Sequence, residues 1–235
     1  MRALLLDLDD TLLDYSGDID VSWRVACTTG CAGSRVDAER LVTAVEASRR
    51  AFWDDPARFR AERVNMFGAW RKIVEGGLAR LGIEDLELAT HIATGYEALR
   101  RERMRLFPDA LATLEHLCER GVPLGLVTNG DASQQRYKLE RWDLAKYFDV
   151  IVIEGEFGAG KPDEVVYRHA LDALGVAAAE TWMAGDHLEF DVAGPQRLGV
   201  RGAWLDRAGA GLPDGVATRP DRIIRALTEL VADHS

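Results

Sequence analysis

The chain opens on Ala3-Leu4-Leu5-Leu6-Asp7-Leu8-Asp9-Asp10-Thr11, in which a continuous apolar run ends abruptly at an acidic cluster. A short apolar run bounded by polar residues is typical of a strand buried on both faces of a parallel sheet. The pattern recurs at residues 122–127, 150–153, 181–184 and 200–205, and helical patterns lie at about 111–120 and 163–174. This alternation predicts right-handed crossovers and an α/β fold with a doubly wound, mostly parallel, Rossmann-like sheet.

A long helical segment interrupts this alternation after the first strand. One helical stripe contains Met66, Phe67, Trp70, Ile73, Val74, Leu78 and Leu81, and Gly82 follows as a stop. Further helices are predicted at about 21–27, 41–52 and 86–104, with no convincing strand among them. We therefore predict an α/β core of residues 1–15 and 106–235 and an inserted helical domain of residues 16–105. A last amphipathic helix is predicted from Ile223, Ile224, Leu227, Leu230 and Val231.

Composition limits the classes of partner. The 235 residues are 47% hydrophobic, enough for a substantial core, and the net charge of -10 disfavours nucleic acid and anionic membranes as partners. Three cysteines are too few and too odd in number for a disulfide framework, so we expect reduced thiols. With no signal-peptide pattern at the start and no apolar stretch of about 20 residues, we expect a cytoplasmic protein.

Polar residues follow successive predicted strands: Asp7, Asp9, Thr128, Glu154 and Asp186. Ligands bind at the carboxyl ends of the strands in such sheets, so these side chains are expected to share one site. Asp7 and Asp9 would repel each other unless a cation lay between them, and Mg²⁺ favours carboxylates together with phosphate oxygens. The alternative is that residues 7–10 form a solvated turn.

Two further segments carry groups that suit phosphate. Thr128-Asn129-Gly130 offers a hydroxyl and backbone N–H groups at a strand end, although it also reads as an ordinary turn before a helix capped by Asp131. Lys161 lies in Gly158-Ala159-Gly160-Lys161-Pro162, a loop in which it can neutralise a carboxylate nucleophile and a phosphate. The alternative is a lysine that faces solvent.

The last acidic segment is Gly185-Asp186-His187-Leu188-Glu189-Phe190-Asp191. Asp186, at a strand end, can complete a metal site. Asp191, at the start of the next helix, can orient a metal-bound water or Lys161. Helix capping by either acid is the alternative.

Taken in order, residues 7–11, 128–130, 161–162 and 185–191 resemble the four motifs of the haloacid dehalogenase (HAD) superfamily. The helical insert matches its branch with a helical cap after the first strand. The resemblance implies that Asp7 is the nucleophile and Asp9 the general acid/base, and that Lys161 stabilises the nucleophile. Thr128, Asn129, Gly130 and Lys161 would contact the phosphate. It implies Mg²⁺ bound by Asp7, the Asp9 carbonyl and Asp186, with Asp191 in support.

The function predicted is hydrolysis of a small-molecule phosphate monoester through an aspartyl-phosphate on Asp7. Dehalogenases of the superfamily lack the second aspartate, so the presence of Asp9 favours a phosphatase over a 2-haloacid dehalogenase. A phosphorylated receiver domain is disfavoured by the length and the helical insert, and a non-catalytic binding protein by the intact motifs. His187 departs from the pattern, because relatives usually carry Ser or Thr there.

The substrate is predicted less sharply. Thr128 to Asp131 with Gln134, Gln135 and Lys138 resembles N-acylneuraminate-9-phosphatases and nucleotidases of this branch. This favours a sugar phosphate or a nucleoside monophosphate, acted on by a monomer or a homodimer. Residues of the cap (Arg58, Arg60 and Arg63 with Trp53 and Trp70) form a hypothetical contact for an anionic or planar part of the substrate. The alternative is that the tryptophans pack the cap core and the arginines face solvent.

Overall fold

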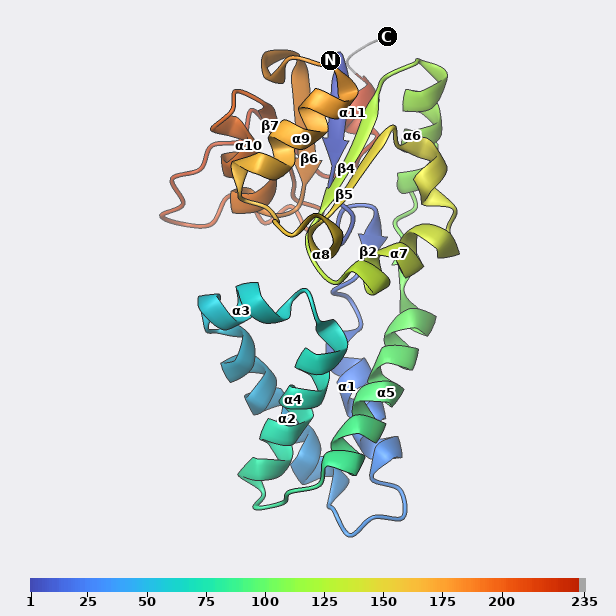
Figure 1. Cartoon of the computed structure of the whole chain (residues 1–235), viewed down its shortest axis with the longest axis vertical. Helices are drawn as coiled ribbons and strands as arrows, with labels where there is room; N and C mark the ends of the chain where they lie inside the picture. The colour runs from blue at the N-terminus through green and yellow to red at the C-terminus, as the bar shows by residue number, and fades with distance from the viewer. Residues whose placement is uncertain (233–235) are drawn as a thin grey trace. The chain divides into compact units, whose positions relative to one another are not determined.

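Six parallel strands form the central sheet of the structure, a computed structural model that describes residues 1–232 (Figure 1). The order across the sheet is β5–β4–β1–β6–β7–β8. Their bounds are β1 Ala3–Leu6, β4 Leu124–Thr128, β5 Val150–Ile153, β6 Thr181–Gly185, β7 Arg201–Leu205 and β8 Arg222–Ile224. All four residues of β1 are buried, as its unbroken apolar sequence requires. The predicted α/β class with a parallel sheet is confirmed.

The first strand of the chain lies in the middle of the sheet. Leu4 is aligned with Leu124 of β4 on one side and with Trp182 of β6 on the other. The strand order reverses direction at this point, since the chain continues to β4 and β5 on one side and to β6, β7 and β8 on the other. A crevice outside the carboxyl ends of the strands is expected at such a position.

Helices cover both faces of the sheet. They are α6 Ala110–Glu119, α7 Ala132–Arg141, α8 Glu154–Phe157, α9 Glu164–Leu174, α10 Gly194–Gln196 and α11 Glu229–Ala232. Short 3₁₀ turns occupy Leu144–Tyr147 (η1) and Ala178–Glu180 (η2), and a π-helical turn occupies Leu188–Ala193 (η3). In Figure 1, α9 and α6 lie on opposite sides of the sheet. Val166, Tyr167, Ala170 and Leu171 of α9 pack with Leu5 and Val127 of the strands.

The predicted last helix is wrong in its first part. Ile223 and Ile224 belong to β8, which pairs in parallel with β7 so that Leu205 lies opposite Ile224. Ile224 is fully buried whereas Ile223 is 46% exposed, the alternation of a strand with one buried face. The open edge of β7 therefore recruits this β-branched pair, and the helix begins only at Glu229.

Residues 15–104 form a compact helical unit of their own, and residues 1–14 join those from 105 onward in the other unit. The helices are α1 Ile19–Gly30, α2 Ala38–Trp53, α3 Pro56–Glu62, α4 Met66–Arg80 and α5 Leu86–Arg103. Asp37, Asp55, Asn65 and Asp85 each accept a backbone N–H at the start of a helix. The short α3, which holds Arg58 and Arg60, was not predicted.

Aromatic residues fill the core of the helical unit. Tyr96 stacks on Trp23 with ring centroids 3.8 Å apart, and Trp70 meets the same ring edge-on at 5.2 Å. Trp53 packs edge-on against Phe59. The tryptophans named as hypothetical substrate contacts are thus packing residues of this unit, as the alternative prediction held. That alternative also had the arginines facing solvent, whereas Arg63 is 6% exposed and lies over the Phe59 ring.

A two-stranded ribbon marks where the chain leaves the sheet unit and returns to it. Leu13–Asp14 (β2) pairs antiparallel with Arg105–Leu106 (β3), so Leu13 faces Leu106 and Asp14 faces Arg105. Strands of two residues leave no hydrophobic pattern, and neither was predicted.

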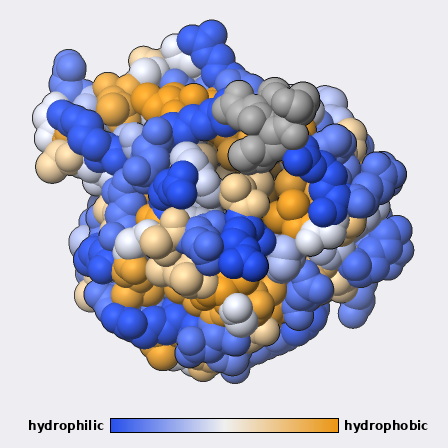
Figure 2. Space-filling view, turned by 90° about the horizontal axis from the view of Figure 1, so that it is seen from above, coloured by the Kyte–Doolittle hydropathy of each residue, from blue (hydrophilic) through white to orange (hydrophobic). Residues whose placement is uncertain are grey.

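The surface mixes polar and apolar residues. Figure 2 shows one face, on which apolar areas are separated by hydrophilic side chains. Large exposed apolar residues are spread along the described chain: Val21, Val64, Leu86, Leu111, Phe157, Val165 and Ile223. Within residues 1–232, no helix combines the length and apolar character that crossing a membrane requires.

Candidate active site

Asp7 lies directly after β1 and both of its carboxylate oxygens are held. Its backbone N–H extends the pairing with β6 by donating to the Ala184 carbonyl at 3.1 Å. Lys161 Nζ lies 2.7 Å from Asp7 Oδ1, and the Thr11 hydroxyl donates to Oδ2 at 3.1 Å. Asp10 adopts the left-handed conformation (φ 57°), which turns the chain sharply after the strand. The strand end thus presents one fixed carboxylate.

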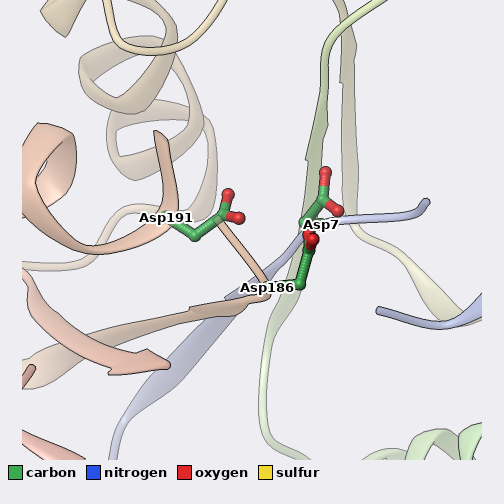
Figure 3. A group of neighbouring side chains, drawn as sticks. All are labelled: Asp7, Asp186 and Asp191. Carbon is green, nitrogen blue, oxygen red and sulfur yellow. The ribbon is translucent and has the colours of Figure 1, made fainter. Parts of the chain in front are cut away.

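Three carboxylates from different elements converge at this point (Figure 3). Oxygens of Asp7, Asp186 and Asp191 all lie within 4.8 Å of one another. Asp186 directly follows β6, and Asp191 belongs to the π-helical turn η3. Turns of this kind occur often at functional sites. Asp9 is not part of this carboxylate group; its backbone carbonyl was the group expected to bind the metal.

The carboxylates carry more negative charge than the site neutralises. Burial raises the pKa of Asp7 from an ordinary 3.8 to about 7, against the attraction of Lys161. Burial also raises the pKa of Asp186 to about 8, and the neighbouring Asp7 and Asp191 add to that rise. Oxygen ligands with unbalanced charge are what a hard divalent cation requires, so the residues present fit Mg²⁺.

Lys161 is buried (2% exposed) between two of these acids. Its Nζ lies 2.7 Å from Asp7 Oδ1 and 2.6 Å from Asp191 Oδ1. Burial by itself lowers the pKa of Lys161, but Asp191 and Asp7 outweigh this and raise it, so the side chain stays an ammonium. The alternative of a solvent-facing lysine does not describe this structure.

Asn129 holds the Lys161 loop through its side chain. Asn129 Nδ2 donates to the Lys161 carbonyl at 2.8 Å, and the Lys161 N–H donates to Asn129 Oδ1 at 2.7 Å. Gly160 packs closely beside them, because a Cβ there would lie 2.7 Å from Asn129 Oδ1. The side chain of Asn129 thus positions Lys161 here, a different contact from the predicted one with phosphate.

Thr128 and Gly130 lie at the end of β4. Thr128 is 2% exposed, and its hydroxyl oxygen accepts from Gln135 Nε2 at 2.7 Å. Gly130 has φ 116°, which favours glycine, and its N–H donates to Glu154 Oε2 at 2.9 Å. Glu154, at the end of β5, therefore braces the turn that bears Thr128.

Asp9 contacts a different cation from Asp7. Lys138 Nζ lies 2.7 Å from both oxygens of Asp9, and Gln135 Nε2 lies 3.1 Å from Oδ2. Sequence reasoning noted Gln135 and Lys138 only as part of a resemblance and gave them no contact. Their spacing on one helical face was the available signal, but it did not name the partner.

His187 occupies the start of the π-helical turn and caps it. Its Nδ1 accepts the N–H groups of Glu189 at 3.2 Å and Phe190 at 3.3 Å, and its ring stacks on Phe190 with centroids 3.8 Å apart. The His187 N–H donates to Asp191 Oδ2 at 3.0 Å. This imidazole accepts the N–H groups that a Ser or Thr oxygen accepts at a helix start.

Comparisons with known proteins agree with this geometry. The family model of the haloacid dehalogenase-like hydrolases matches residues 1–199. The chain is 36% identical to phosphoserine phosphatase of Thermus thermophilus, over 98% of each chain. It is 28% identical to N-acylneuraminate-9-phosphatase of Rattus norvegicus, over 99% of this chain and 93% of that protein.

A comparison with solved structures also finds proteins of this fold. The crystal structure of the HAD-hydrolase YfnB from Bacillus subtilis superposes with a TM-score of 0.73 at 22% identity, covering 97% of this chain and 96% of that one. The residues matched by the family model, 1–199, include all four motif segments of the site. The chain belongs to the haloacid dehalogenase-like hydrolases.

Proposed function

We propose that this HAD-family phosphatase hydrolyses a small-molecule phosphate monoester with the help of Mg²⁺, through a phosphoryl group held on Asp7. The observation that carries the proposal is the fixed Asp7 carboxylate, 2.7 Å from a buried ammonium and within 4.8 Å of two further acids. Phosphoryl transfer needs a carboxylate nucleophile whose charge is balanced by a cation such as Lys161. It also needs nearby acidic ligands that can hold a metal ion.

The first half-reaction transfers the phosphoryl group to the enzyme. An oxygen of Asp7 attacks phosphorus, the bond from phosphorus to the ester oxygen breaks, and the leaving oxygen takes a proton from Asp9. Lys161 balances negative charge on the nucleophile and the phosphoryl group, while the Thr128 hydroxyl contacts a phosphate oxygen. We assign Mg²⁺ to Asp7, Asp186 and the backbone carbonyl of Asp9, where it would neutralise phosphate charge.

The second half-reaction returns the enzyme to its first state. Asp9, now a carboxylate, takes a proton from water, and the water oxygen attacks phosphorus. The bond from phosphorus to Asp7 breaks, which releases inorganic phosphate. Asp191 holds Lys161 in place through both steps, because it lies 2.6 Å from Nζ. A positioned acid/base is typically worth ~10²–10⁴ in rate.

The substrate class comes from the relatives named above. We propose a polar metabolite that carries one phosphate ester, with phosphoserine, a sugar phosphate and a nucleoside monophosphate as first candidates. A cytoplasmic location and a monomeric or homodimeric state remain predictions.

Phosphate release tests the proposal. Wild-type protein and Asp7→Asn are assayed on these esters with Mg²⁺ and with a chelator. We expect release that requires both Mg²⁺ and Asp7, and trapping of a phosphoryl group on Asp7 by rapid acid quench. Release that survives Asp7→Asn would refute the nucleophile. Halide release from a 2-haloacid without metal, and no phosphate release, would identify a dehalogenase.

A further inference from the structure

Lys138 and Gln135 are buried beside Asp9, although they lie on a helix rich in polar residues. Lys138 of α7 is 3% exposed and Gln135 is 2% exposed. Lys138 Nζ lies 2.7 Å from each oxygen of Asp9 and 2.6 Å from Gln135 Oε1. An ammonium has three N–H donors, so these three acceptors are enough to satisfy it.

Gln135 links Asp9 to the phosphate-contacting turn. Its Nε2 lies 3.1 Å from Asp9 Oδ2, 2.7 Å from Thr128 Oγ1 and 3.0 Å from the Asn129 carbonyl. Its Oε1 accepts from Lys138 at the same time. One amide therefore sets the distance between the proposed acid/base and the hydroxyl at the end of β4.

Asp9 needs such a support. It lies three residues beyond the end of β1, just before the left-handed Asp10, and its side chain is 25% exposed. A short side chain at such a turn has several rotamers, whereas proton transfer requires one position within hydrogen-bond reach of the reacting oxygen. Burying an ammonium is costly unless it is paired, so the pair makes one orientation of Asp9 strongly preferred.

We propose that Lys138, assisted by Gln135, is the positioning residue that aims Asp9 at the leaving-group oxygen. The inference rests on the proposed role of Asp9 as general acid/base. Lys138 acts through Asp9 and does not contact the substrate. A lysine that bound phosphate directly would instead support every ester equally.

The leaving group separates these two roles. An alkoxide, as in phosphoserine, is a strong base and leaves only if it is protonated. The p-nitrophenolate ion is a weak base and leaves without a proton. The value of kcat/KM reports the steps up to release of the first product, so it isolates the protonation of the leaving group.

The experiment compares Lys138→Met with wild-type protein on phosphoserine and on p-nitrophenyl phosphate. We expect kcat/KM for phosphoserine to fall about 10- to 100-fold, part of the ~10²–10⁴ from acid catalysis, and for the aryl ester less than about 3-fold. Lys138→Arg restores the charge and is expected to recover part of the loss on phosphoserine. Arg136→Gln is the matched control: it removes a cation of the same helix that pairs with Glu156 at 2.6 Å. It is expected to change neither ester.

A double variant keeps the test decisive if Lys138→Met folds poorly. Asp9→Asn with Lys138→Met removes both charges of the pair, which is easier to tolerate than removing one. If Lys138 acts through Asp9, this double variant matches Asp9→Asn on phosphoserine within about 2-fold. An equal loss on both esters, or an additive loss in the double variant, overturns the inference. A wild-type enzyme that releases no phosphate overturns the proposed function and this inference with it.

Discussion

Raising the pH is expected to weaken the metal-free protein and to strengthen its response to Mg²⁺. Asp7 has a pKa of about 7 in the folded protein, and Asp186 a pKa of about 8, against an ordinary 3.8. Between these values the folded protein keeps protons that the unfolded chain has lost. The stability from this protonation is complete below about pH 4 and is lost as the pH rises through 7 and 8.

The magnitude follows from the width of that window. Each group that is protonated only in the folded state costs about 1.4 kcal/mol of unfolding free energy per pH unit. With two such groups, the metal-free protein loses roughly 2–3 kcal/mol per unit between pH 5 and pH 7. We expect Mg²⁺ to bind the deprotonated carboxylates and to displace these protons, so that its stabilising effect grows with pH at a similar rate.

Urea unfolding with a chelator and with Mg²⁺, at pH 5, 6, 7 and 8, measures both trends. Asp186→Asn isolates the carboxylate contribution, because it keeps the five histidines that also titrate in this range. Without metal, the variant is expected to match the wild type at pH 5 and to exceed its stability by about 3–4 kcal/mol at pH 8, because one group loses about 1.4 kcal/mol per pH unit over this range. It is also expected to lose the response to Mg²⁺. A difference between variant and wild type that stays constant with pH would refute the reasoning.

Two further perturbations probe the π-helical turn. His187→Ala is expected to lower the unfolding free energy in urea by about 1 kcal/mol, whereas His187→Ser recovers most of it; equal losses would exclude a capping role. Gly185→Ala places a Cβ 2.3 Å from the Asp191 carboxylate, so kcat is expected to fall by ~10²-fold as that carboxylate moves. Gly95→Ala, where a Cβ meets nothing within 4 Å, is the control, and unchanged kcat in both would contradict the argument.

The strands of the sheet and most of the polar residues at their carboxyl ends were predictable, because each is marked by a short local stretch of sequence. Each buried strand leaves an apolar run, and the residue after the run lies at the carboxyl edge whatever the rest of the chain does. Asp7, Thr128 and Asp186 are placed by this rule alone. The order of strands, with β1 between β4 and β6, then brings together side chains that are over 100 residues apart in sequence.

Contacts that depend on a distant partner could not be read in the same way. Lys138 and Gln135 have the sequence pattern of a solvated helix face, and their burial depends on distant partners, the Asp9 carboxylate for both and the end of β4 for Gln135. The side chain of Asn129 bonds to the backbone of Lys161, and backbone groups leave no mark in the sequence. Ile223 and Ile224 form a strand because the edge of β7 is open to pairing. That open edge exists only once the sheet has assembled, so the local sequence does not reveal it.

The two buried lysines pair with different acidic side chains of the site. Lys161 balances Asp7 and Asp191, and Lys138 balances Asp9, so two ammonium groups face four carboxylates once Asp186 is counted. Burial raises the pKa of both Asp186 and Asp7 above the ordinary value. We expect a cation bound here to favour the ionised form of Asp186, as the attraction of Lys161 favours the ionised form of Asp7.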